Sequence, residues 1–272
     1  MRSPFHVWTD VCQMPSGRDR SSSSSSIVAN AAAAHTAGIV GGSSFSTRAA
    51  SCNAHGEACS RSSMDQDGAM SEVQRVGQEQ LEAVATTVAA SFADDPIWQW
   101  IYNTGDQTIP IEIGIVLARM LVAQSTPVDA IHVATGCGAV ALWSAPAGSS
   151  SPDNEQLRDE QTGTHFAAFA GQIGDRIALT GKLSETMKRH RPDEPHWYLG
   201  ILGTHPDHQN QGLGSAVLTT MVAQADKLGI PTFLESSNPR NYGFYQRHGY
   251  VETGEITVED SPPLRHFWRT PR

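Results

Sequence analysis

The sequence lacks any long run of apolar residues. Its 272 residues contain no stretch of roughly eighteen or more apolar side chains, the length that a membrane-spanning helix needs. A surplus of basic charge is also missing. The formal net charge is −9, whereas binding to nucleic-acid phosphates requires a basic face. We therefore expect neither a membrane nor a nucleic acid as partner. The acidic balance suits an amine-bearing ligand, although most acidic proteins are acidic for solubility alone.

Cysteine is scarce, and its spacing fits neither a disulfide framework nor a metal site. The four cysteines are Cys12, Cys52, Cys59 and Cys137. No Cys-x-x-Cys pair occurs, and His205 and His208 have no third ligand nearby, so we expect no metal. This usage is typical of a reducing compartment, and we expect a cytoplasmic protein.

Several catalytic signatures are absent as well. No Gly-x-Ser-x-Gly sequence occurs, so a serine hydrolase has little support. Gly-x-Gly-x-x-Gly is missing, which argues against a dinucleotide fold. Gly212 and Gly214 are not followed by Lys-Ser or Lys-Thr, which argues against a nucleoside-triphosphate loop.

Composition divides the chain into two regions. Up to about residue 63, Ser and Ala dominate, and large apolar residues are too few to offset the entropy of ordering. We expect a disordered leader over residues 1–69 and a folded domain over residues 70–272. The leader contains arginine but no lysine, so an organelle transit peptide, with import, is one reading. An upstream extension of the reading frame, with initiation at Met64 or Met70, and a plain disordered tail are the others.

Hydrophobic periodicity predicts strands and helices in the second region. Strands are expected at 72–76, 131–134, 139–143, 197–202, 232–235, 250–258 and 264–270. Helices are expected at 81–92, 111–123, within 165–189, from 214 to 228 and at 241–248. Asp94-Asp95-Pro96 should end the first helix. The fold class is α/β (α+β), a mixed central sheet flanked by helices with a parallel strand–helix–strand crossover.

Two of these elements carry further expectations about burial. Strand 197–202 is continuously apolar, as expected for a strand buried on both faces. The helix after Gly214 should bury one face. That face consists of Val217, Met221, Ala225 and Leu228.

Glycines stand where strand 197–202 leads into this helix. Gln209-x-x-Gly212-x-Gly214 precedes the helix N-terminus, whose free N–H groups and dipole bind anions. Glycine lets a pyrophosphate approach the main chain without meeting a Cβ atom. Two glycines before a helix are also ordinary turn chemistry, and the motif by itself leaves both readings open.

The order of several short motifs resembles the GNAT acetyltransferases. The motifs are His190-Arg191-Pro192, Glu194-Pro195, Pro206-Asp207-His208-Gln209, Gly212 to Val217, Phe233-Leu234-Glu235, Pro239-Arg240-Asn241, Phe244-Tyr245 and Gly249-Tyr250. The resemblance covers about residues 73–272 and is dense from 191 to 251. Within the superfamily, the chain is most similar to the puromycin N-acetyltransferases.

This resemblance implies a GNAT fold whose two central strands splay to admit acetyl-CoA as co-substrate. It implies that Leu202 and Thr204 pair with the pantetheine amide, as an added strand would. Asn241 would hydrogen-bond the cofactor, and Asn238 is a weaker candidate. Main-chain donors would hold the pyrophosphate; these belong to Gln209, Asn210, Gln211, Gly212, Leu213, Gly214 and Ser215.

The sequence also departs from the family pattern. Gln211 stands where many relatives carry Lys or Arg, so one positively charged side chain that would contact the phosphates is missing. Asn210 and Gly243 replace a common Gly and Pro, and Gly203-Thr204 is a looser strand end than the usual β-branched pair. These differences bear on cofactor affinity more than on reaction type.

Two residues are candidates for proton transfer. Tyr245 matches the family's proton donor, and a phenol with a pKa of about 10 can protonate a departing thiolate. The alternative for Tyr245 is a packed core aromatic. Glu235, at a strand end, can take a proton from the attacking ammonium, directly or through water. Its alternative is a place in a structural hydrogen-bond network.

No motif identifies the acceptor amine. The family resemblance implies a pocket built by 97–124 and 258–267, which show only apolar periodicity and aromatics. Trp98, Trp100 and Tyr102 can line it or pack in the core. We expect direct acetyl transfer to a small-molecule amine, such as a puromycin-like aminonucleoside or another xenobiotic amine. The alternatives are a protein or peptide N-acetyltransferase and an idle CoA-binding sensor domain; a monomer or homodimer is expected.

Overall fold

The computed structural model describes residues 73–125, 131–134, 136–149 and 152–272. The leader expected at 1–69 lies outside these ranges, together with Cys12, Cys52 and Cys59, so the expectations for it stay predictions. Cys137 is free and buried.

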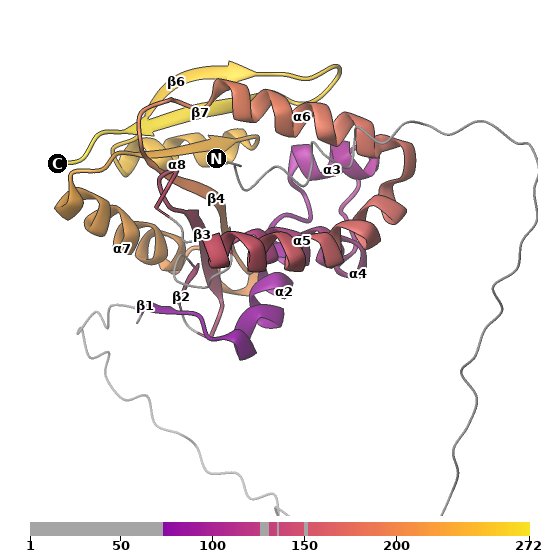
Figure 1. Cartoon of the computed structure of the whole chain (residues 1–272), viewed down its shortest axis with the longest axis horizontal. Coiled ribbons are helices and arrows are strands. Elements are labelled where there is room, and N and C mark those ends of the chain that lie inside the picture. Colours follow the sequence, from indigo (N-terminus) through magenta and orange to yellow (C-terminus); the bar gives the residue numbers. More distant parts are fainter. Residues whose placement is uncertain (1–72, 126–130, 135, 150–151) are drawn as a thin grey trace, which may run out of the picture. The chain divides into compact units, whose positions relative to one another are not determined.

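The described chain folds into strands and helices (Figure 1). The strands are β1 (Val73–Arg75), β2 (Ile131–Ala134), β3 (Ala139–Ser144), β4 (Trp197–Thr204), β5 (Thr232–Ser236), β6 (Val251–Ile256) and β7 (Leu264–Arg269). The helices are α2 (Leu81–Ser91), α3 (Pro96–Tyr102), α4 (Ile111–Gln124), α5 (Pro152–Ile173), α6 (Ile177–His190), α7 (Leu213–Leu228) and α8 (Tyr242–Arg247). Short 3-10 turns are η1 (Gln78–Gln80), η3 (Gly174–Arg176), η4 (Pro206–His208) and η5 (Pro239–Asn241).

The strands form one seven-stranded sheet in the order β1-β2-β3-β4-β5-β7-β6. β4 and β5 run parallel, and the other neighbouring pairs are antiparallel. α7 makes the crossover between β4 and β5, because a parallel pair cannot be joined by a tight turn. The expected mixed sheet with a central parallel crossover is therefore confirmed.

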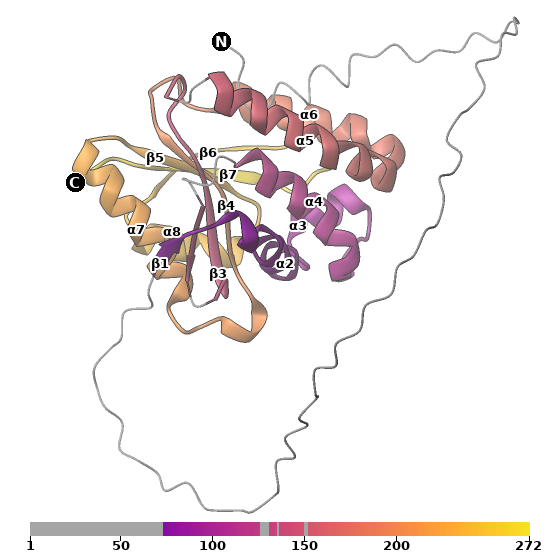
Figure 2. The ribbon, with the colours of Figure 1, turned by 60° about the horizontal axis from the view of Figure 1, so that its bottom comes forward.

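Alternating side chains of β3 separate two apolar layers, because successive strand residues point to opposite faces. Val140 and Leu142 belong to the layer that contains α2 and α4. Ala141 and Trp143 belong to the layer that contains α7. Figure 2 shows α7 and α8 gathered apart from α3, α4, α5 and α6.

A β-bulge at Gly200 reverses this alternation in β4. Leu142 pairs with Ile201, whereas Trp143 pairs with Leu199, so Gly200 is left out of the register. Leu199 consequently faces the α7 layer and Ile201 the α2 layer, although they are two residues apart. The bulge lies in the middle of the strand that borders the site described below.

Two predicted helices differ in extent from the expectation. Asp94-Asp95-Pro96 does follow the end of α2, but it also begins α3, which the sequence analysis missed. Asp95 caps α3 and Pro96 occupies its first turn, where a missing N–H costs nothing. The helix expected within 165–189 is two helices, α5 and α6, because Gly174 takes a left-handed φ of 56° between them.

Two expectations about burial were wrong in part. Leu228 is 56% exposed, because it is the last residue of α7 and lies beyond the sheet face that buries Val217, Met221 and Ala225. Strand 197–202 is not buried on both faces throughout. Gly200 is exposed, because the partner strand β5 has already diverged at that point.

Candidate active site

β4 and β5 separate part-way along the sheet. Their pairing is limited to Trp197–Leu199 against Thr232–Leu234, while β4 continues to Thr204. Beyond Leu199, β4 therefore has a neighbour on the β3 side only. The expected splay between the two central strands is present, and it leaves one main-chain edge of β4 open.

The pairing on the β3 side shows which β4 groups face this opening. His205 N–H donates to the Gly138 carbonyl at 2.9 Å. In an antiparallel ladder the hydrogen-bonded residues alternate, so Ile201 and Gly203 direct their polar groups to β3. Leu202 and Thr204 direct theirs to the opening. The Thr204 carbonyl is occupied by the Gln209 side-chain amide at 3.3 Å.

The loop between β4 and α7 is braced by its own side chains. The Gln209 and Gln211 amides donate to the carbonyls of Thr204 and Asp207, both at 3.3 Å. Gly212 caps α7 with a left-handed φ of 80°, a conformation that glycine adopts without strain. The first N–H groups of α7, from Leu213 to Ser215, thereby stay available at the positive end of the helix.

Two further glycines of this region allow close packing. A Cβ on Gly214 would lie 3.1 Å from the Thr204 hydroxyl oxygen, so the loop closes tightly on the end of β4. A Cβ on Gly203 would lie 2.2 Å from the Ser91 hydroxyl oxygen. Gly203, at the end of β4, therefore leaves room for the side chain of Ser91, the last residue of α2.

A cavity of about 200 Å³ adjoins the opening between the strands. Its lining comes from helices α3, α4, α5, α6 and α8, from strands β3, β4, β5 and β7, and from the segment after β5. The apolar part includes Ile97, Trp98, Ile101, Leu117, Met120, Leu121, Phe169, Leu183, Met187 and Leu264. Residues of 97–124 line this cavity, and Leu264 lines it from 258–267; that it receives the acceptor stays a prediction. The contribution of α6 was missed.

The three aromatic candidates of α3 have different positions. Trp98 is buried and lines the cavity. Trp100 donates its indole N–H to Asp260 at 2.9 Å, and Tyr102 donates its hydroxyl to the Ile113 carbonyl at 3.3 Å. Trp100 and Tyr102 therefore fasten α3 to its surroundings.

Tyr245 lines the cavity from α8 and is otherwise packed in aromatic rings. Its ring lies 5.5 Å from Phe244, 5.6 Å from Phe267 and 6.0 Å from Tyr250, measured between centroids. Burial raises the pKa of the Tyr245 hydroxyl, and the nearby Tyr250 and Asp95 raise it further. The phenol therefore keeps its proton at neutral pH, as a proton donor must.

The two asparagine candidates differ as well. Asn241 lines the cavity at the end of η5. Asn238 caps that turn, because its side-chain oxygen accepts the Arg240 N–H at 3.1 Å. Asn238 thus has a local structural role, and its part in cofactor binding stays a prediction.

Glu235 borders the cavity, but its carboxylate is enclosed. The side chain is 1% exposed, and neither oxygen has a hydrogen bond within 3.5 Å to the described residues. Arg191 Nε lies 3.8 Å from one carboxylate oxygen. Burial raises the pKa of Glu235, and the Arg191 charge and the Tyr198 hydroxyl oppose that rise. An amine in the cavity cannot touch the carboxylate directly in this conformation.

Asp95 is a second buried carboxylate at the cavity, where its sequence context predicted only the end of a helix. One oxygen accepts the N–H groups of Ile97 and Trp98 at 3.0 and 3.2 Å. The other accepts the Ser237 hydroxyl at 2.7 Å. An Asp-Pro pair before an apolar run is a helix-start signal, so this role was readable from the sequence.

Among the residues with described positions, no group of three His, Cys, Asp or Glu side chains could hold a metal ion. His205 and His208 have ring centroids 6.0 Å apart. None of the helices in the described ranges is long and apolar enough to cross a bilayer.

Residues 140–250 match the model of the acetyltransferase (GNAT) family. That range contains the splayed strands, the glycine loop and Tyr245. Over these residues the chain is similar to the GNAT N-acetyltransferases. An uncharacterized N-acetyltransferase of Schizosaccharomyces pombe is 22% identical over 213 residues, which cover 72% of this chain and 82% of that protein. The domain is that of an enzyme that uses acetyl-CoA.

Solved structures share the GNAT fold. An arylalkylamine N-acetyltransferase from Aedes aegypti has a TM-score of 0.52 at 13% identity, covering 74% of this chain and 99% of its own. A polyamine N-acetyltransferase from Drosophila melanogaster, which forms N-acetylagmatine, has a TM-score of 0.52 at 17% identity, with coverages of 73% and 99%. A Corynebacterium glutamicum acetyltransferase, described with histone acetyltransferase HPA2, has a TM-score of 0.51 at 23% identity, with coverages of 74% and 97%.

Proposed function

We propose that this enzyme acetylates a small-molecule amine that has one basic nitrogen and a largely apolar body. The cavity beside the splayed strands carries this proposal, because apolar side chains dominate its lining. Acetyl-CoA would lie between β4 and β5, with its pantetheine along Leu202 and Thr204. Its pyrophosphate would lie at the loop of residues 209–215, and Asn241 would bond the pantetheine arm.

The chemistry is direct attack in a ternary complex. The amine nitrogen attacks the thioester carbonyl, and the tetrahedral intermediate collapses to the amide and the CoA thiolate. Tyr245 gives its proton to that thiolate. Glu235 finally accepts the proton that the amine loses, and transfer of one proton through solvent from Glu235 to the Tyr245 phenolate restores both groups.

The two carboxylates at the cavity favour a monoamine over a polyamine. Asp95 already accepts three hydrogen bonds, and Glu235 is enclosed beside Arg191. Neither carboxylate is free to hold the second cation of a polyamine. Burying an unpaired cation against apolar walls is costly, so the body of the acceptor should be apolar. Among the structural neighbours, this is closer to an arylalkylamine than to agmatine.

Thiol release from acetyl-CoA, measured with a panel of acceptors, tests this proposal. The panel holds 2-phenylethylamine, agmatine, spermidine, a puromycin-like aminonucleoside and a short peptide. We expect kcat/KM for the apolar monoamine to exceed that for the polyamines by at least about tenfold. That ratio corresponds to a cost of about 1.4 kcal/mol for placing the second cation of a polyamine in the cavity. A preference for agmatine would refute the assigned class.

Two variants of one cavity residue sharpen the test. Ser184 lines the cavity and is half-buried, so Ser184→Asp adds a carboxylate there, and Ser184→Asn is its uncharged control. Only Ser184→Asp should raise kcat/KM for agmatine relative to phenylethylamine. Preference for the peptide would indicate a protein N-acetyltransferase. Binding of CoA without turnover of any amine would indicate a sensor domain.

A further inference from the structure

Glu235 requires an intermediary, because both of its carboxylate oxygens are buried and the acceptor cannot reach them. Strand register identifies the neighbours on its face of the sheet. Tyr198 pairs with Phe233, two residues before Glu235, and side chains two apart on a strand share a face. His266 pairs with Glu235 itself from β7.

Tyr198 connects the carboxylate with the cavity. Its ring is buried in β4 and borders the cavity. Its hydroxyl is near enough to Glu235 to affect the pKa of that carboxyl, and the two groups must approach to hydrogen-bond distance for a transfer, because neither Glu235 oxygen has a hydrogen bond to the described residues in this conformation. Burial and the Glu235 charge raise the pKa of this phenol, so it remains neutral at neutral pH. A neutral hydroxyl can accept a hydrogen bond from one side while donating to the other.

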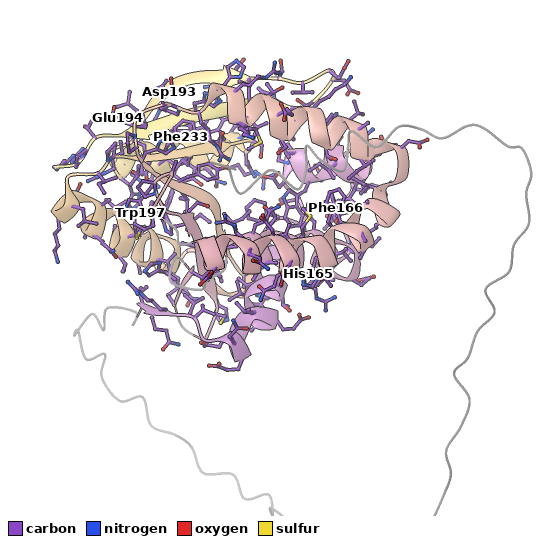
Figure 3. The ribbon with its side chains drawn as sticks, viewed as in Figure 1. His165, Phe166, Asp193, Glu194, Trp197 and Phe233 are labelled. Carbon is purple, nitrogen blue, oxygen red and sulfur yellow. The ribbon has the colours of Figure 1, made fainter. Side chains whose placement is uncertain are left out.

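Arg191 fixes both of these groups. It follows α6 in an extended conformation, and its guanidinium lies 3.6 Å from the centroid of the Tyr198 ring. Its Nε is 3.8 Å from Glu235, and the side chain is 15% exposed. A cation over an aromatic face that also neighbours a carboxylate is held by both. Figure 3 marks this corner by Asp193 and Glu194 between α6 and β4 and by Phe233 on β5.

We propose that Tyr198 relays the amine proton to Glu235, and that Arg191 is the positioning residue that holds Tyr198 and Glu235 in place. The ammonium formed on attack gives its proton to the Tyr198 oxygen as the Tyr198 hydroxyl proton moves to Glu235. One N–H bond and one O–H bond break, and two O–H bonds form. Tyr198 ends neutral and Glu235 protonated. The inference rests on the proposed function, since it concerns the same reaction.

The expected signature is in the pH dependence of kcat/KM. Only ionised Glu235 can accept the proton, so activity should rise with pH through the Glu235 ionisation. We call this rise the acidic limb of the pH profile. Removing the Arg191 charge beside Glu235 should move the acidic limb to higher pH by about 1 to 3 pH units. Other titratable groups near this corner are His190, His196 and His266. The His190 and His266 ring centroids are 6.3 Å apart, and burial, with a smaller effect of the Arg191 charge, lowers the pKa of His196. Burial, His190 and Arg191 lower the pKa of His266.

The experiment compares four variants on one acceptor, so that the ionisation of the acceptor is the same throughout. Arg191→Met should shift the acidic limb to higher pH, whereas Arg191→Lys should restore most of the shift. Tyr198→Phe should lower kcat by about a hundredfold or more, with the affinity for acetyl-CoA unchanged. His266→Gln is the control that should leave the limb in place.

Different outcomes separate this inference from the proposed function. A wild type without turnover of any amine contradicts the proposed function before any variant is made. A folded Arg191→Met enzyme with an unmoved limb overturns the role of Arg191. If that variant does not fold, Tyr198→Phe decides, because it keeps the ring on which Arg191 stacks. Unchanged kcat in Tyr198→Phe overturns the relay.

Discussion

Tyr245 and Tyr250 have rings 6.0 Å apart, yet their hydroxyl groups have different surroundings. Tyr245 borders the cavity, and its hydroxyl has no hydrogen bond to another described residue. The Tyr250 hydroxyl accepts the Thr232 hydroxyl at 2.9 Å in the core. One phenol is therefore placed to meet a ligand, and the other satisfies a buried partner.

This contrast gives a prediction with an internal control. In Tyr245→Phe the ring remains and the proton donor is lost, so kcat should fall by about a hundred- to ten-thousand-fold. The dissociation constant of acetyl-CoA should hardly change, because the hydroxyl acts as the thiolate leaves. Steady-state kinetics and calorimetric titration measure the two quantities.

Tyr250→Phe is the matched control. It should leave kcat unchanged and lower the free energy of unfolding by about 1 to 3 kcal/mol, because Thr232 loses a buried partner. If both variants kept full turnover, another group or water would supply the proton.

At the scale of one element, α7 has a left-handed glycine at each end. Gly212 precedes it with φ 80°, and Gly229 follows it with φ 66°. A Cβ atom at either position would meet nothing within 4 Å. An alanine at either position therefore brings the same backbone strain of about 1 to 2 kcal/mol. Only Gly212 lies at the anion-binding end of the helix dipole.

The two alanine variants should consequently separate stability from cofactor binding. Gly212→Ala and Gly229→Ala should lower Tm by similar amounts. The affinity for CoA should fall at least about tenfold in Gly212→Ala alone, because its Cβ would point where the pyrophosphate meets the main chain. Equal CoA affinities in the two folded variants would place the pyrophosphate elsewhere.

At the scale of the whole domain, one ion pair joins the crossover helix to the last strand. Both Arg269 terminal nitrogens donate to Asp226, at 2.7 and 2.8 Å. Arg269 Nε also donates to the His248 carbonyl at 3.1 Å. The pair thus ties α7 to β7 and to the connection after α8. Arg269, through its hydrogen bonds, lowers the pKa of Asp226 below its ordinary value.

A lowered pKa in the folded state has a defined effect on stability. The stabilisation is present above the ordinary Asp pKa of about 3.9, and it is lost as the pH falls through the lower folded value. Near pH 7, Asp226→Asn should therefore lower the free energy of unfolding, measured in urea, by about 1 to 2 kcal/mol, because the pair is partly exposed. The difference from the wild type should shrink at about pH 3.

The control for this experiment is Asp106→Asn, at an exposed position between α3 and α4. It should match the wild type at both pH values. A difference between Asp226→Asn and the wild type that stayed constant with pH would mean that lost packing, and not charge, explains the destabilisation.

Much of the architecture was readable from local pattern. Two short apolar runs on either side of Gly136-Cys137-Gly138 predicted β2 and β3 as a hairpin. Helical periodicity predicted α2, α4 and α7, because that repeat reflects which face a helix buries. The order of the surrounding motifs predicted the roles of the glycine loop and Tyr245, and these roles stay predictions. α3 was missed because its seven residues are too few for periodicity to show.

The sequence by itself determined the fold class, the crossover and the family's motifs, since these depend on neighbours in the chain. Tertiary structure decided the rest of the site. Arg191, Tyr198 and Glu235 come from a helix end and two strands, and only strand register and the stacked guanidinium bring them together. The enclosure of Glu235 and the saturation of Asp95 likewise depend on side chains far away in sequence. Burial and charge pairing are properties of the packed domain, so no local pattern carries them.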